Sequence, residues 1–172
     1  MKIKIGEICL YGILGVLLFA LKFVMASLPN VEPVSFFLIV YTIAFGIKTL
    51  YPLAVYVCLE ILIYGFGFWS VAYLYIWLVL VFATLIAFKI TKHSMNSLLY
   101  AAISCLFGLF FGALYIPLYV VSGGFAFAVT WWISGLPYDI IHGVANFILC
   151  IILFKPITKA VLILKQQIIK TK

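Results

Sequence analysis

The chain has 172 residues, of which 68% are hydrophobic and only 9% are charged, and its formal net charge is +7. A soluble domain has about a quarter of its residues charged, so this composition excludes an ordinary soluble domain and predicts a protein whose solvent is lipid. The positive charge does not indicate a nucleic-acid partner. It comes from lysines that flank the apolar runs, where they set membrane topology and meet anionic lipid headgroups.

The apolar runs predict a single all-α domain of six membrane-spanning helices. The expected spans are residues 6–26, 34–46, 51–64, 70–88, 97–121 and 138–154, followed by a basic tail over 155–172. The second and third spans are short and could form a re-entrant pair instead of two crossings. Lys48 between them favours two crossings, because a re-entrant pair would bury it in hydrocarbon.

Turn residues separate these spans. Pro29 and Pro33 flank the first connection, and Gly65 and Gly67 interrupt the chain after the third span. The longest irregular connection is expected over residues 122–137, which contain Gly123, Gly124 and Pro137.

Lysines occupy every second connection. They are Lys2 and Lys4, then Lys48, then Lys89 and Lys92, and finally Lys155, Lys159, Lys165, Lys170 and Lys172. This alternation is the positive-inside pattern, and it predicts that both ends of the chain lie in the cytoplasm of a multi-pass membrane protein.

The remaining charges, apart from Glu7, fall at the opposite ends of the expected spans. Lys22 lies about one turn before the end of the first span and Glu60 one turn before the end of the third. Glu32 lies in the first connection, and Asp139 lies in the first turn of the sixth span. Ionisable groups inside a membrane are functional candidates, because their burial is unfavourable. A structural alternative is that Lys22 pairs with Glu32 or Glu60 and that Asp139 caps its helix.

A polar stripe and a group of aromatic residues lie at the same level. Asp139, His142 and Asn146 are spaced i, i+3 and i+7, so they share one helix face, which should point away from lipid. The nearby aromatic candidates are Tyr64, Trp69, Tyr73, Trp131 and Trp132. An interfacial belt explains some of these rings, but their concentration at one end favours an aromatic-lined pocket that opens outward.

Motifs of the common hydrolases and nucleotide-binding proteins are missing from the sequence, so we expect no catalytic residues, no metal and no cofactor. The four cysteines are widely spaced and lie in apolar runs, which favours small buried residues over metal ligands.

Three segments resemble the substrate-binding S components of energy-coupling factor (ECF) vitamin transporters. They are residues 28–34 (LPNVEPV), residues 64–67 (YGFG) and residues 136–143 (LPYDIIHG), and the likeness in length and span number covers the whole chain. The resemblance implies that a vitamin-like substrate binds near the first, third and fifth connections. It also implies a membrane coupling subunit and two ATPase subunits as partners.

The resemblance further implies a docking face on the first span, where the family often has Ala-x-x-x-Ala. This chain has Gly12, Gly15 and Ala20 there instead, which also permit close helix approach. Gly108 and Gly112 form a second small-residue pair, which favours packing within the bundle.

The charges and rings of the expected pocket favour a flat, neutral or cationic substrate, such as a vitamin, a vitamin precursor or a nucleobase-like compound. If Lys22 pairs with one acid, the remaining lining is net negative. Two alternatives stay open. One is a non-catalytic assembly or regulatory membrane protein, and the other is a small lipid-modifying enzyme that uses Asp139 and His142 as a base pair.

Overall fold

A computed structural model describes residues 5–169, and every regular element in this part of the chain is helical. The elements are α1 (Ile5–Val24), α2 (Val34–Phe45), the 3-10 helix η1 (Gly46–Thr49), α3 (Leu50–Tyr64), α4 (Phe68–Ile90), α5 (Ser97–Leu109), the 3-10 helix η2 (Ala113–Tyr115) and α6 (Ile116–Ile169).

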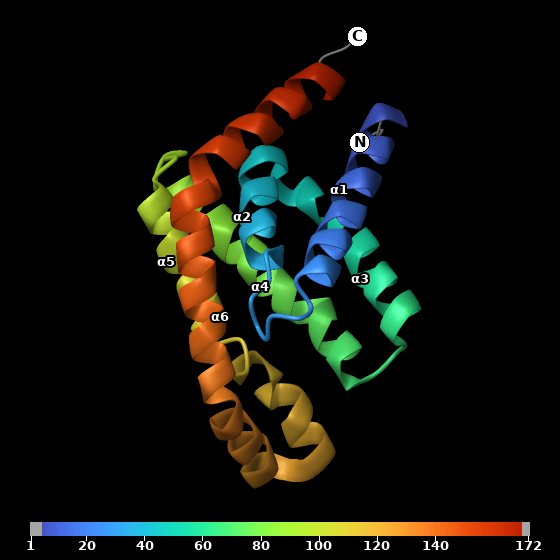
Figure 1. Cartoon of the computed structure of the whole chain (residues 1–172), viewed down its shortest axis with the longest axis vertical. Helices are drawn as coiled ribbons and strands as arrows, with labels where there is room; N and C mark the ends of the chain where they lie inside the picture. Colours follow the sequence, from blue (N-terminus) through green and yellow to red (C-terminus); the bar gives the residue numbers. More distant parts are fainter. Residues whose placement is uncertain (1–4, 170–172) are drawn as a thin grey trace.

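The helices form a bundle in which the chain reverses direction between successive helices from α1 to α5, continues through η2 into the first part of α6, and turns back within α6 (Figure 1). The start of α1 and the end of α6 lie at the same end of the bundle, together with η1. The connection between α1 and α2 and the turn between α3 and α4 lie toward the other end. We call the first end the lysine-rich end and the second the acidic end, after the lysines and acids they carry.

Helical stretches of the described chain are long and apolar enough to cross a membrane. Four qualify: Ile5–Val24, Val34–Tyr64, Phe68–Ile90 and Ala113–Ile169, whereas Ser97–Leu109 is shorter. Large apolar side chains cover their outer faces, with Val24 and Leu62 each 77% exposed. Such surfaces are stable in lipid and unstable in water, so the structure confirms the expected all-helical class and supports a membrane protein.

Two of the expected interruptions are confirmed. Residues 25–33 separate α1 from α2, with Asn30 at a positive φ of 55°. Gly65 ends α3 at φ 82°, a conformation that side-chain-bearing residues rarely adopt, and α4 begins three residues later.

The expected irregular connection over residues 122–137 is wrong. Helix continues through most of it, and only Gly124 leaves the helical conformation, with φ 82° and ψ 170°. Pro137 and Pro156 lie inside α6 without ending it, as prolines often do in helices of membrane proteins. The sixth span and residues 155–169 of the basic tail are therefore one helix that begins after Gly124, and Lys170 and Lys172 lie outside the described residues.

The fifth span also differs from expectation, because it does not continue unbroken from residue 97 to 121. α5 ends at Leu109, and the chain passes through η2 before helix resumes at Ile116. The backbone N–H of Gly112 in this break donates to the Asp139 carboxylate, with both oxygens at 3.1 Å. A side chain of α6 thus satisfies a backbone donor that an uninterrupted helix would have paired internally.

Small residues set the closest helix contacts. A Cβ added to Gly108 of α5 would lie 2.7 Å from the backbone nitrogen of Gly143 in α6, so these two helices touch through their backbones. Packing within the bundle, as expected for the Gly108 and Gly112 pair, is confirmed. Gly15 of α1 has the same role against α3, since its added Cβ would lie 2.5 Å from Val55 Cβ.

Lysines at the lysine-rich end hold several helices together. Lys48 Nζ of η1 lies 2.5 Å from Glu7 Oε1 in α1. Lys165 Nζ of α6 donates to the carbonyl of Ala44 at 2.5 Å, which places the end of α6 over the C-terminal end of α2. A cation at this position complements the negative end of the α2 dipole.

Candidate functional site

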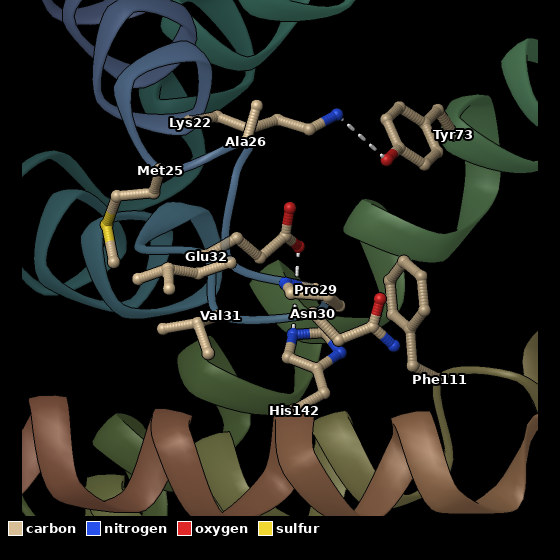
Figure 2. A pocket seen from close by; sticks show the side chains of 11 residues that line it. Lys22, Met25, Ala26, Pro29, Asn30, Val31, Glu32, Tyr73, Phe111 and His142 are labelled. Atoms are coloured by element: carbon tan, nitrogen blue, oxygen red, sulfur yellow. Dashed lines mark hydrogen bonds and ion pairs between the residues drawn. The ribbon is translucent and has the colours of Figure 1, made fainter.

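A cavity of about 330 Å³ lies at the acidic end of the bundle, beneath the connection between α1 and α2. Lys22, Glu32, Tyr73, Phe111 and His142 supply its charged and aromatic lining, and residues 25–31 supply much of the rest. Figure 2 shows Lys22 pointing toward Tyr73, while Glu32 lies between Lys22 and His142. Its volume is at the small end of the range for small-molecule pockets.

Lys22 anchors one wall of the cavity. Its Nζ lies 2.6 Å from Glu60 Oε2 and 3.3 Å from the Tyr73 hydroxyl. The Lys22 side chain is 24% exposed, whereas the Glu60 side chain is only 2% exposed. The C-terminal parts of α1 and α3 are therefore joined by a largely buried ion pair, and Glu60 itself does not line this cavity.

Glu32 and His142 form the opposite wall. His142 Nε2 lies 3.7 Å from Glu32 Oε1 and 3.5 Å from Ser35 Oγ, and the His142 side chain is only 2% exposed. Burial raises the pKa of the Glu32 carboxyl in its loop, although the nearby Lys22 opposes that shift. Since Glu60 already neutralises Lys22, an ionised Glu32 leaves this lining net negative.

The Ser35, His142 and Glu32 contacts do not make a hydrolytic triad. Both neighbours face the same ring nitrogen, Nε2. A catalytic histidine uses one nitrogen for the nucleophile and the other for the orienting acid, so this geometry does not provide an activated serine.

A second cavity of about 340 Å³ adjoins the first. Its lining is Lys22, Glu60, Tyr64, Trp69 and Tyr73, so Lys22 and Tyr73 belong to both cavities. The Trp69 and Tyr73 rings meet edge to face at 5.4 Å. Lys22 also lies over the Tyr73 ring, with Nζ 5.2 Å from the centroid.

The remaining predicted site residues lie outside both linings. Asp139 accepts from Gly112 N–H as described above, and Trp132 lies beside Gly112. The Trp131 ring packs 4.2 Å from Tyr119, so it joins the two arms of α6 on either side of Gly124. Asn146 donates to the Ser104 carbonyl at 3.3 Å and is fully buried. In this structure Asn146 links α6 to α5, Asp139 and Trp132 lie against the break after α5, and Trp131 packs within α6.

The structure thus brings seven of the eleven predicted substrate-site residues into the two adjoining cavities and leaves the other four in helix contacts. Sequence reasoning missed Phe111 and Ser35. Phe111 lies in the break after α5, which was expected to be helix, and its ring packs 4.9 Å from His142. Ser35 could have been noticed as a hydroxyl directly after the proline-flanked first connection.

Comparisons with known proteins give no match to any family model, to any curated protein or to any solved structure. The functional assignment therefore depends on the sequence pattern and on this geometry.

Proposed function

We propose that this chain is the substrate-binding component of an ECF-type importer in the bacterial plasma membrane and that it binds a vitamin or a vitamin precursor. The observation that carries the proposal is the cavity between Lys22, Glu32 and His142, at the end of the bundle opposite the lysines. The lysine pattern supports an outward-facing orientation for that end. ATP hydrolysis would be carried out by separate subunits that dock through a membrane coupling subunit.

The lining favours a ring-bearing substrate that is cationic or rich in hydrogen-bond donors. Glu32 supplies an acceptor, and one of its buried oxygens has no hydrogen-bond partner among the described residues. Tyr73 and Phe111 supply ring faces on which a flat molecule could stack, and a cation over such a ring gains roughly 0.5–2 kcal/mol. A substrate with two carboxylates would instead face the uncompensated charge of Glu32.

Ligand binding to the purified protein tests this proposal. We expect one member of a panel of vitamins and precursors to raise the thermal transition of the chain in detergent, and the same compound to co-purify by mass spectrometry. Glu32→Gln should weaken that binding by about 1–3 kcal/mol, because it removes a charged acceptor. Glu7→Gln is the matched control, since it makes the same chemical change at the lysine-rich end.

A protein that binds no compound of the panel and co-purifies with none would support the assembly or regulatory alternative. Equal ligand affinity of Glu32→Gln and the wild type would indicate that the ligand binds in the second cavity, beside Trp69.

We propose that the coupling subunit docks on α1 at Gly12 and Ala20, but not at Gly15. Gly12 has open space around its Cα and Ala20 is exposed, whereas Gly15 is enclosed by α3. Ala20→Leu should therefore impair uptake in cells that contain the coupling module while leaving ligand binding unchanged. Unimpaired uptake in Ala20→Leu and in Gly12→Leu would exclude this face.

A further inference from the structure

A groove at the lysine-rich end combines positive charge with an apolar floor. It has a volume of about 300 Å³, and its lining is Met95, Phe154, Lys155, Thr158, Lys159, Leu162, Ile163 and Gln166. Apart from Met95, all of these residues belong to α6. We propose that this groove binds the headgroup and the upper acyl chain of an anionic phospholipid.

Charge is the first argument. Lys155 and Lys159 are spaced i and i+4, so they are neighbours on one face of α6 and repel each other. The sequence has four acids, Glu7, Glu32, Glu60 and Asp139. None of them lines the groove, because Glu7 contacts Lys48 and the other three lie at the acidic end. A phosphate between the two lysines would supply the missing negative charge.

The apolar side of the groove is fixed in place. Phe154 is buried, and its ring stacks on Tyr100 of α5 with centroids 4.9 Å apart. The Tyr100 hydroxyl donates to the Ser94 carbonyl at 3.0 Å, which holds the loop that carries Met95 against this side. Leu162 and Ile163 continue the apolar lining along α6. This surface suits hydrocarbon, and the lysine stems can extend along it with their ammonium groups toward the headgroups.

Thr158 provides an independent observation. Thr158 lines the groove and is only 4% exposed, and its hydroxyl has no hydrogen-bond partner among the described residues. A buried hydroxyl without a partner is unfavourable, and a phosphate or glycerol oxygen would satisfy it. Basic pockets at this level of a membrane protein are recognised sites for anionic headgroups. The proposal does not depend on the proposed function, because it requires only that the chain lies in a membrane.

Native mass spectrometry of the detergent-purified chain tests the proposal, with equimolar phosphatidylglycerol and phosphatidylcholine as probes. We expect preferential retention of phosphatidylglycerol. The variant Lys155→Gln/Lys159→Gln should lower that retention about thirtyfold, given roughly 1 kcal/mol per lysine at a lipid surface. Thr158→Val should lower it without changing the charge. Lys89→Gln/Lys92→Gln is the matched control, because it removes two charges outside the groove.

Three results would overturn the proposal: equal retention of the two lipids, an equal loss in the control variant, or displacement of the lipid by soluble glycerol phosphate at the same concentration. The second result would indicate diffuse attraction to the whole basic end, and the third would indicate a headgroup site without a role for the apolar floor. Size-exclusion profiles of all variants confirm that each is folded when it is measured.

Discussion

Lys22 and Glu60 are unequal partners in their ion pair, because the acid is almost fully buried and the lysine is not. Lys22→Met would leave a buried carboxylate without its cation, which should destabilise the protein by ~3 kcal/mol. Glu60→Gln should have a smaller effect of about 1 kcal/mol, because the Lys22 ammonium can still reach the Tyr73 hydroxyl and the cavity. Thermal unfolding in detergent measures both changes.

The double variant Lys22→Met/Glu60→Gln completes the comparison. It should be more stable than Lys22→Met alone, since it removes the carboxylate that the single change strands. If Lys22→Met is at least as stable as Glu60→Gln, the difference in burial between the two residues does not determine how much each contributes to stability.

As pH rises, Glu32 should lower the stability of the fold and strengthen the binding of a cationic ligand. Burial raises the pKa of its carboxyl above the ordinary value of 4.5, so the folded state binds its proton more tightly than the unfolded state does. The free energy of unfolding contributed by this group is therefore fully present below pH 4.5 and is lost as pH rises through the raised pKa. Binding of a cationic ligand should instead strengthen over the same window, because it needs the ionised carboxylate.

Glu32→Gln should remove both dependences. Unfolding and ligand titrations from pH 4 to pH 8 check this expectation, with Glu7→Gln again as the control. A binding curve that keeps its pH dependence in Glu32→Gln would assign that dependence to another group in the cavity, such as His142.

The sequence predicts site residues correctly where a buried charge requires a partner of opposite charge. Lys22 had to find an acid, and either Glu32 or Glu60 would have satisfied the sequence argument. Which acid pairs with it depends on the relative rotation of α1, α3 and the first connection, which no local pattern specifies. Asp139 could not be placed either, because its partner is the Gly112 N–H, and that donor becomes free only where α5 breaks.

At the level of the helices, α5 and α6 are held at a distance that only glycine permits. A Cβ at Gly108 would lie 2.7–2.9 Å from backbone atoms of His142 and Gly143, which cannot move aside as a flexible side chain can. Gly108→Ala should therefore destabilise the protein by roughly 1–3 kcal/mol and weaken ligand binding, because the shift displaces His142. Gly12→Ala is the matched control, with no atom within 4 Å of the added Cβ.

Thermal unfolding and ligand titration of the two alanine variants measure these effects. Gly12→Ala should be neutral or slightly stabilising, because alanine is the better helix former. Equal behaviour of the two variants would contradict the close contact of α5 with α6.

Helix boundaries followed the sequence at the first connection and failed at Pro137. Pro29, Asn30 and Pro33 together end α1 and delay α2. Pro137 by itself does not interrupt α6, because the helix around it is otherwise well supported. Packing of Trp131 on Tyr115 and Tyr119 holds the segment after Gly124 against the segment before it, and such a contact across a turn is not readable from composition.

For the whole molecule, the lysines in every second connection predict six crossings with both ends in the cytoplasm. In a cysteine-free background, Phe66→Cys and Lys89→Cys report on opposite ends of α4. Phe66 is 72% exposed in the turn before α4, and Lys89 lies in its last turn. A membrane-impermeant maleimide should label Phe66→Cys in intact cells and should label Lys89→Cys only after permeabilisation.

The reverse pattern would place the cavity on the cytoplasmic side and would contradict an uptake function, even if α4 still crosses the membrane. Labelling of both positions in intact cells would mean that α4 does not cross at all. A separate labelling site tests whether the short helices α2 and α3 each cross the membrane. Ile47→Cys provides it, because Ile47 is 49% exposed beside Lys48. Protection of Ile47→Cys in intact cells, with labelling after permeabilisation, supports two short crossings. Labelling from outside would show that the segment Val34–Tyr64 enters and leaves on one side.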